Sequence, residues 1–396
     1  MLTRQQMHAS KCTRPSLRPH CSRHTARCRP AAAAASDVYR PPSVAPALSE
    51  LALLAQFSKI VPDQLQLPST VEGVQLATAA SVTFGQLRAI AASLNSTPLQ
   101  NCIAAARNYH PDPERQVEKA MVNVGTLLAD QVQGRIATEV DPRLANDKDG
   151  MVLKARALLS LYREAGLPRD RLLFRLPATW AGVQAARQLE SANIPTQLQV
   201  HSLVQGAAAA QAGVSVVSVN VGRTREWYAR HPGAIRDPQG PRQDAGGLSG
   251  PDPGVALACD VYNYVKAYHQ RTQVMASGLR TREDAEALAG CDFLLLPGSV
   301  IQALAATPTA AGYNDGWRAG GPGGEEEEEP GLRARLSPEA AKAAAPAEME
   351  QLTEALFRER LGQAGSELLA RALKDSVESV DALGSLARAT IGRSST

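Results

Sequence analysis

The order of strand-like and helix-like segments predicts an α/β protein built as a single (β/α)8 barrel, a TIM barrel. Short β-branched or leucine-rich runs alternate with amphipathic stretches, which is typical of parallel strands joined by helices. About eight such runs fall within about 250 residues, the usual size of one barrel. A doubly wound sheet is the alternative, but no glycine-rich turn follows Val61.

Eight segments carry the strand signal: 58–61, 76–82, 135–140, 172–176, 196–201, 214–219, 273–276 and 292–296. Helix signals fall between them. Asp112 and Pro113 supply a cap and a first helical position, and Thr179 is expected to cap a helix. Thr281 and Asp284 form a capping box. Further helices are expected over 151–166 and around residues 207, 227 and 262.

The amino-terminal residues 1–47 are predicted to be a transit peptide followed by a disordered lead. From Met1 to Ser36 there is no acidic residue, whereas basic residues are interspersed with Ser, Thr and Ala. No apolar segment typical of a secretory signal follows. We therefore expect import into an organelle, the plastid stroma in preference to the mitochondrion, with a disordered basic tail as the alternative.

Residues 48–305 are expected to form the barrel, with a loop insertion rich in Pro, Gly and Asp at 231–251. Residues 306–346 contain a run of five glutamates and are predicted to be a disordered acidic linker. Residues 347–396 carry leucines at helical spacing. We expect them to form a terminal helical pair that covers the barrel or supports a dimer, so a monomer and a homodimer both remain open.

Composition argues against several classes of partner and cofactor. A formal net charge of +3 is too small for a nucleic-acid surface, and no run approaches 18 apolar residues, so no membrane span is expected. Only Cys102, Cys259 and Cys291 follow the amino-terminal segment, without a C-x-x-C pair or a His/Cys cluster. We therefore expect no metal, no cofactor and a reducing compartment.

Several motifs resemble those of the transaldolase family, in the family's order. Residues 137–144, ATEVDPRL, are similar to its third-strand motif, and residues 173–180, LFRLPATW, to its fourth. Residues 218–223, SVNVGR, resemble the sixth-strand motif, and residues 274–292 the seventh-strand and eighth-strand region. The resemblance covers about residues 48–304. The segment 58–63, SKIVPD, looks closest to plant and algal plastid-type members.

The resemblance implies a barrel of the class I aldolase type and an activity in the pentose phosphate pathway. In that family a lysine amine attacks a ketose phosphate to form a Schiff base, and a three-carbon dihydroxyacetone unit moves to an aldose phosphate. A first-strand carboxylate and a third-strand glutamate supply proton transfers. Those acids correspond to Asp63 and Glu139. The partners implied are ketose and aldose phosphates.

The family's catalytic lysine corresponds to Arg175. A guanidinium stays protonated and has no free amine lone pair, so Arg175 is not competent to form the usual Schiff base. Other polar positions differ as well: the second-strand asparagine corresponds to Ala80, and the fifth-strand asparagine and threonine to Gln197 and Gln199.

The phosphate-binding positions are better preserved. Arg223 and Arg280 match the family's two phosphate-contacting arginines, and forked guanidinium donors suit phosphate oxygens. Ser218 matches a contact to a substrate hydroxyl, whereas Gly278 replaces a phosphate-binding serine. Binding can therefore outlast catalysis.

Structural interpretations compete with these roles. Asp63 and Glu139 could be ion-pair partners of Arg175, and Arg223 and Arg280 could be surface charges. His201 could be a general base, although a satisfied core histidine is the commoner case.

Another lysine could in principle supply the amine that Arg175 lacks. Lys59 should point the same way as Asp63 but about 13 Å deeper along the strand. Lys154 and Lys266 lie on amphipathic helices and should face outward, and Trp180 and Trp227 are expected to be packing anchors.

Three hypotheses follow. The first is a plastid transaldolase-family protein that binds sugar phosphates but has lost Schiff-base turnover wholly or nearly so. The second is an active transaldolase that uses an unrecognised amine to transfer a dihydroxyacetone unit from sedoheptulose 7-phosphate to glyceraldehyde 3-phosphate. The third is a non-catalytic regulatory or scaffold protein.

Overall fold

The computed structural model describes residues 48–63, 70–71, 74–76, 78–93, 97–234, 252–309, 317–319 and 333–394. By contacts the chain divides into Met1–Ala45 and Pro46–Thr396, and all of the described residues belong to the second unit. The predicted transit peptide, the glutamate run and most of the loop insertion lie outside the described residues.

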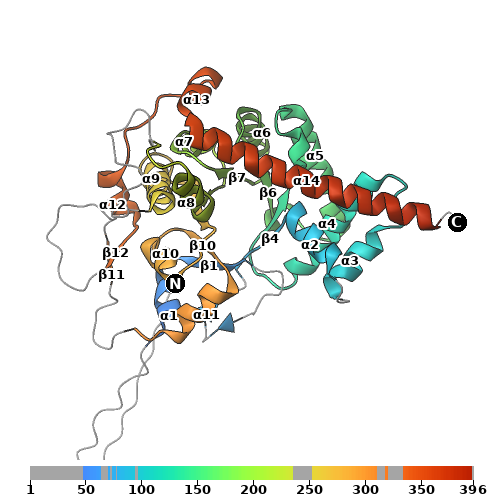
Figure 1. Ribbon diagram of the computed structural model, residues 1–396, viewed down its shortest axis with the longest axis horizontal. Helices are drawn as coiled ribbons and strands as arrows, with labels where there is room; N and C mark the ends of the chain where they lie inside the picture. Colours follow the sequence, from blue (N-terminus) through green and yellow to red (C-terminus); the bar gives the residue numbers. More distant parts are fainter. Residues whose placement is uncertain are drawn as a thin grey trace, which may run out of the picture. The chain divides into compact units, whose positions relative to one another are not determined.

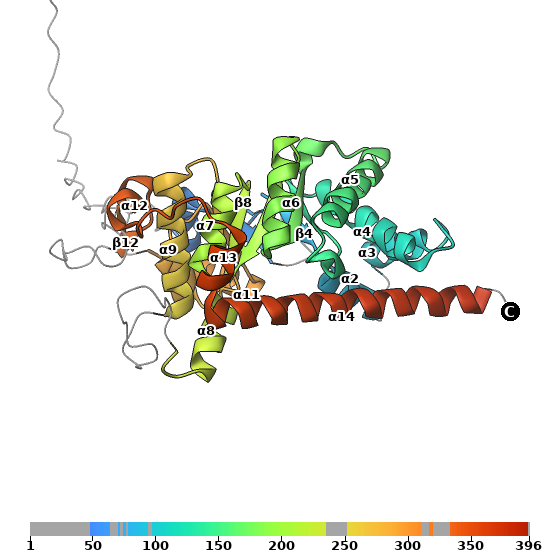
Figure 2. The same cartoon turned by 90° about the horizontal axis from the view of Figure 1, so that it is seen from above.

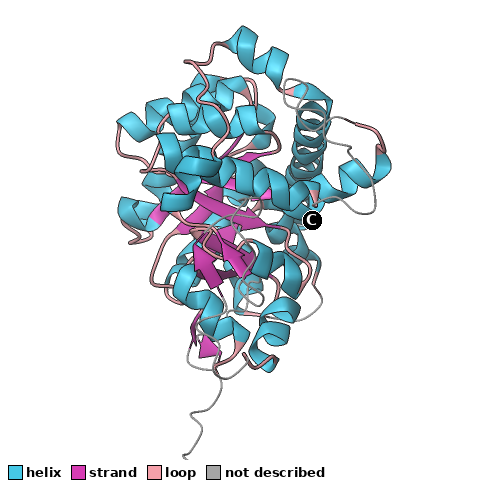
Figure 3. Cartoon of the chain, turned by 90° about the vertical axis from the view of Figure 1, so that its left-hand side faces the viewer, coloured by secondary structure: helices cyan, strands magenta, loops and turns pink. Residues whose placement is uncertain are grey.

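Eight parallel strands form one sheet in the order β1-β10-β9-β8-β7-β6-β5-β4, surrounded by helices (Figure 3). The strands are β1 (Lys59–Pro62), β4 (Ala80–Val82), β5 (Ile136–Glu139), β6 (Leu172–Pro177), β7 (Thr196–Val200), β8 (Val216–Asn220), β9 (Gln273–Ser277) and β10 (Phe293–Leu296). Each overlaps a segment predicted to be a strand. Between the two edge strands, the Thr78 hydroxyl donates to the carbonyl of Ile60 at 2.7 Å. The predicted (β/α)8 TIM barrel is confirmed, in nearly closed form.

Helices follow the strands as predicted (Figure 1). They are α1 (Glu50–Phe57), α2 (Phe84–Ala92), α3 (Pro98–Ala106), α4 (Pro113–Ala129), α5 (Lys148–Glu164), α6 (Trp180–Ser191), α7 (Leu203–Gln211), α8 (Val221–Arg230), α9 (Pro253–Tyr268), α10 (Arg282–Ala287) and α11 (Gly298–Ala306), with short 3-10 turns η1 (Pro142–Leu144) and η2 (Arg169–Arg171). Asp112, Thr179 and Thr281 cap their helices as expected, since each side chain accepts a backbone N–H of the first turn.

Two short strand pairs lie outside the barrel sheet. β2 (Thr70–Val71) pairs with β3 (Val74–Gln75) antiparallel, and β11 (Trp317–Ala319) pairs with β12 (Arg333–Arg335) parallel.

The segment expected to be a disordered linker contains a helix, α12 (Pro338–Ala344), which packs against α9. Just before it, Leu336 is buried, and its N–H donates to the carbonyl of Ala289 at 2.7 Å. Gly290 has a φ of +91°, and a Cβ there would lie 1.9 Å from the Leu336 carbonyl oxygen. The part of 306–346 that contains Leu336 and α12 is therefore ordered. The absence of a side chain at Gly290 lets the Leu336 backbone pack closely against the turn before β10.

Apolar side chains fill both faces of the sheet, as parallel strands covered by helices require. Outside the barrel, Met121, Tyr162 and Phe174 are fully buried between strands and helices. Inside it, a smaller cluster joins Ala137, Leu173, Val216 and Met275 to the half-buried Phe293 and Leu295.

Lys266 on α9 does not face outward as predicted. It is 6% exposed, and its Nζ lies 2.7 Å from an Asp292 carboxylate oxygen and donates to the carbonyl of Thr272 at 3.3 Å. The reason is that α9 packs against α7, α8 and α12, which leaves little of its surface in water. Lys154 is half-buried and pairs with Glu118.

The carboxyl-terminal segment forms α13 (Glu354–Arg360) and the long helix α14 (Gly362–Ser394), which confirms the predicted terminal helices. α14 packs against α2, α4, α8 and η1, and it passes along the barrel from α8 to beyond α2 in two perpendicular views (Figures 1 and 2). Since α2, η1 and α8 follow the carboxyl ends of β4, β5 and β8, α14 covers part of the barrel mouth. No described helix is long and apolar enough to cross a membrane.

Candidate active site

The barrel encloses a cavity of about 660 Å³, and most of the predicted site residues line it. Its lining includes Asp63, Arg175, Gln197, Gln199 and Ser218. Alternation along parallel strands explains this grouping, because residues two apart on one strand share a face. The register pairs Arg175 with Gln197 and Gln199 with Ser218, so neighbouring strands present these side chains together.

Arg175 lies on β6, the fourth barrel strand in chain order. Its half-buried guanidinium donates to the amide oxygen of Gln199 across the cavity wall. Glu139 is its register partner on β5. A permanently protonated group therefore stands in the cavity wall, where it can bind anionic or carbonyl oxygen but cannot add to a carbonyl carbon.

Asp63 follows β1 directly, and its N–H donates to the carbonyl of Leu296 at 2.8 Å. Removal of the carboxyl group from water raises the pKa of Asp63, and the positive charge of Arg175 opposes this rise. The charge of Arg175 therefore favours the ionised form of the Asp63 carboxyl.

Glu139 is held by other partners. One carboxylate oxygen accepts the N–H of Phe84 at 2.9 Å, and the other accepts the hydroxyl of Ser376 at 3.1 Å. Phe84 opens α2, so a buried carboxylate caps a helix amino terminus, where negative charge is stabilised. The hydrogen bonds described for the Glu139 carboxylate thus come from α2 and α14, and the pairing with Arg175 that the sequence left open is not among them.

The two predicted phosphate arginines lie on adjacent connections at the barrel mouth. Arg223 is in the first turn of α8, after β8, and Arg280 follows β9, which pairs with β8. Neither lines the cavity itself. The Arg223 guanidinium lies 3.0 Å from a carboxylate oxygen of Asp375 on α14, and Arg280 pairs with Glu226. Both guanidinium groups thus lie at the mouth, and each forms an ion pair with a carboxylate.

Asn220 and Gly278 belong to the same region and were not recognised as a pair from the sequence. The Asn220 side chain accepts the N–H of Arg223 at 3.0 Å and caps α8. Gly278 has a φ of +70°, and a Cβ there would lie 2.4 Å from Asn220 Oδ1. The glycine at the position where the resemblance implies a serine therefore suits both the left-handed backbone and the Asn220 cap.

Restoring that serine is expected to destabilise the protein. Gly278→Ser should lower the free energy of unfolding by about 1–3 kcal/mol, because it combines a left-handed backbone with a clash against Asn220. Gly166→Ser is the matched control, since Gly166 has a φ of +84° but no atom within 4 Å of its added Cβ. Urea unfolding measures both, and an equal loss in the two variants would contradict the role of Asn220.

His201 directly follows β7 and is almost fully buried, with its Nδ1 lacking a hydrogen-bond partner. Burial, reinforced by the charges of Arg223 and Arg175, lowers the pKa of His201 to about 3. The imidazole is therefore neutral at physiological pH. Its burial fits a core position better than a general base, but its unpartnered Nδ1 differs from the satisfied core histidine expected from the sequence.

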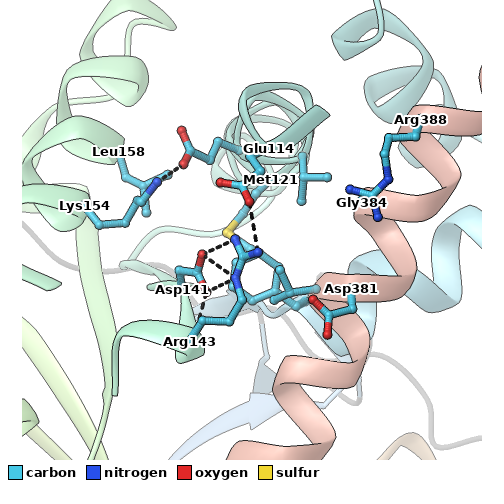
Figure 4. A pocket seen from close by; sticks show the side chains of 13 residues that line it. Glu114, Met121, Asp141, Arg143, Lys154, Leu158, Asp381, Gly384 and Arg388 are labelled. Atoms are coloured by element: carbon cyan, nitrogen blue, oxygen red, sulfur yellow. Dashed lines mark hydrogen bonds and ion pairs between the residues drawn. The ribbon is translucent and has the colours of Figure 1, made fainter. Parts of the chain in front are cut away.

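A second, smaller pocket holds the charged residues Asp141 and Arg143 of the 137–144 motif. It lies between α4, α5 and α14 (Figure 4), where Arg143 bonds Asp141 at 2.6 Å and Glu114 at 3.0 Å. These bonds raise the pKa of Arg143, and they fix the η1 turn after β5. Asp141 and Arg143 of this motif thus have a structural role. The η1 turn that they fix packs against α14.

Sequence reasoning missed the contribution of α14 to the site. Asp375 and Ser376 reach Arg223 and Glu139, but the only signal in that segment was an apolar helical repeat. The expected packing roles of Trp180 and Trp227 agree with the structure, since the Trp180 ring packs against that of Phe357 in a tilted arrangement and Trp227 is 4% exposed. Among the described residues, no group of three His, Cys, Asp or Glu side chains is arranged to hold a metal.

Comparisons with known proteins agree with this geometry. The family model described as Transaldolase/Fructose-6-phosphate aldolase matches residues 86–384, which includes β5 to β10 and most of α14. Proteins named Transaldolase from Shewanella amazonensis and Marinomonas sp. are 38% and 37% identical over 216 and 211 residues. These alignments cover 53% and 52% of this chain and 65% and 63% of the relatives, so the chain spans less than two thirds of their length. The family match extends over most of the chain, and the chain therefore belongs to the transaldolase/fructose-6-phosphate aldolase family.

Proposed function

We propose that this protein binds sugar phosphates in carbohydrate metabolism, in the pentose phosphate pathway, and that its Schiff-base turnover is lost or weak. The observation that carries the proposal is Arg175 in the cavity wall on the fourth barrel strand. A Schiff base requires a neutral amine that adds to the ketose carbonyl and then loses water. The guanidinium cannot take that first step.

The rest of the cavity supports the binding half of the proposal. The amides of Gln197 and Gln199 and the hydroxyl of Ser218 line it, and these groups suit the hydroxyls of a sugar chain. Arg223 and Arg280 stand where the cavity opens and suit a terminal phosphate. Arg175 adds a third cation, which can bind the carbonyl or hydroxyl oxygens of the ligand.

An active transaldolase is the second candidate, and the names of the relatives favour it. It would transfer a dihydroxyacetone unit from sedoheptulose 7-phosphate to glyceraldehyde 3-phosphate. The cavity does contain one lysine, Lys59, whose Nζ lies 5.4 Å from the centre of the Phe293 ring. However, Lys59 begins β1, at the end of the barrel opposite Asp63, so its amine is far from the mouth.

A regulatory or scaffold role is the third candidate, supported by the acidic segment and the terminal helices. Localisation is a further proposal: the acid-free, basic amino-terminal segment supports import into the plastid stroma.

Fructose 6-phosphate is expected to stabilise the protein against heat. A ligand at about 100 times its Kd adds about 2.7 kcal/mol to the free energy of unfolding, which corresponds to a Tm rise on the order of 3 °C for a domain of this size. Arg223→Ala should lose most of this rise, because the guanidinium contact to phosphate is removed. A series of thermal unfolding curves measures the effect.

Arg230→Ala is the control for that series, since Arg230 is an exposed arginine at the other end of the same helix. It should keep the wild-type response. Absence of a shift in the wild type would contradict the sugar-phosphate proposal and favour the scaffold role.

A further inference from the structure

Helix α14 brings two polar side chains to the barrel mouth from a distant part of the chain. The Asp375 carboxylate lies 3.0 Å from the Arg223 guanidinium, and the next residue, Ser376, donates its hydroxyl to Glu139 at 3.1 Å. Arg223 follows β8, whereas Glu139 ends β5. One turn of α14 therefore reaches across the mouth from the phosphate-binding side to the acid on the third barrel strand.

We propose that Asp375 is a built-in competitor for the ligand's phosphate group. Its carboxylate holds the Nη2 donor of Arg223, which a phosphate would also use, so the affinity of the site for phosphorylated ligands is set by α14. This inference rests on the proposed function and names a specificity-determining residue for it.

The chemistry of the pair supports competition. A guanidinium presents the same forked donors to a carboxylate and to a phosphate, and one face cannot serve both. A phosphate placed beside an intact Asp375 would also meet a like charge at short range, which is unfavourable. A phosphate that takes the same Nη2 donor therefore displaces the aspartate from Arg223.

The exposure of the pair makes it displaceable. The Arg223 and Asp375 side chains keep 37% and 47% of their surface in water. Ion pairs this exposed are weak, because solvent screens the attraction and side-chain entropy opposes it. A phosphate carries more charge than the carboxylate and offers more acceptor oxygens, so it can replace the aspartate without unfolding the helix.

Helix α14 has other anchors that remain when Asp375 is released. Val380 and Leu383 are buried in the main core, and Leu368 packs against Trp227 and Tyr228. The indole N–H of Trp227 donates to Glu367 at 2.8 Å. The competitor therefore acts by rotation of one side chain on a helix that stays in place.

The contrast with Arg280 is informative. Arg280 pairs with Glu226, which lies on α8, the helix of Arg223 itself. That pair is local to the phosphate side of the mouth. Of the ion pairs described for Arg223 and Arg280, only the one with Asp375 involves α14.

The test is a calorimetric titration of fructose 6-phosphate into the full-length protein and its variants. Asp375→Asn should bind about 3- to 10-fold more tightly than the wild type, since the competing charge is removed. Asp381→Asn is the matched control, because Asp381 is an exposed aspartate on the same helix that lines the smaller pocket (Figure 4). In the Arg223→Ala background, Asp375→Asn should have no effect beyond about 2-fold, since the contact it relieves is already gone.

The outcomes separate this inference from the proposed function. Equal affinity in the wild type and Asp375→Asn, with binding measurable in both, overturns the competitor and leaves sugar-phosphate binding intact. A gain of the same size in Asp381→Asn also overturns it, because general loss of negative charge then explains the result. Absence of binding in both the wild type and Asp375→Asn overturns the competitor and the proposed function together.

Discussion

The Arg175→Lys variant is expected to form a covalent adduct with fructose 6-phosphate that borohydride traps in near-stoichiometric yield. The change places an amine on β6 at the cavity wall, beside Gln199 and opposite the pocket face that holds Asp63. Partial burial lowers the pKa of such an amine, whereas the charge of the nearby Asp63 opposes that shift, and the neutral fraction of the amine attacks the carbonyl. Intact mass spectrometry after reduction measures the adduct.

Arg175→Gln is the control for the loss of the guanidinium, because it removes the charge without supplying an amine. It should give no adduct. If Arg175→Lys also gives none while still binding the ligand, then the changes at Ala80, Gln197 and Gln199 have altered the site beyond rescue by one lysine.

His201→Phe is expected to make the fold less sensitive to acid. The folded pKa of His201 is about 3 against an ordinary value of 6.5, so the unfolded chain takes up a proton first as the pH falls. Stability contributed by the neutral imidazole is full above pH 6.5 and is lost as the pH falls towards 3. Between pH 7 and pH 5 the wild type should lose about 2 kcal/mol more than the variant.

Urea unfolding at several pH values measures that difference. A His201→Phe curve parallel to the wild type would show that the imidazole is solvated or charged in the folded protein.

Local sequence patterns predicted the barrel because each strand and helix depends mainly on its own residues. Runs such as 172–176 and 214–219 are apolar on both faces, which is what a parallel strand covered on both sides requires. Caps such as Asp112 and Thr179 act within one turn, so the sequence alone located them. Alternation along the strands then grouped Arg175, Gln199 and Ser218 in one cavity.

Contacts between distant segments could not be predicted in this way. Helical periodicity placed Lys266 outward, since it cannot show that α12 and other helices surround α9. The same limit applies to Glu139, whose second oxygen binds Ser376, and to Arg223, whose partner is Asp375. A leucine repeat predicts that α14 is a helix, but not which of its polar residues meet the barrel mouth.

Gly278 illustrates a different limit. Its place in a motif marked it as a lost serine, whereas the backbone requires a residue that tolerates a φ of +70° beside Asn220. The sequence contained both residues, but their coupling depends on the pairing of Asn220 with Ser277 across β8 and β9.

The central claim is that a family site with Arg175 binds sugar phosphates without forming the covalent intermediate. Its most direct test is to incubate the wild-type protein with fructose 6-phosphate and borohydride and to record the intact mass, with the ligand at a concentration that saturates the thermal shift. We predict an unchanged protein mass. A stoichiometric adduct on the wild-type chain would contradict the account and show that another amine performs the chemistry.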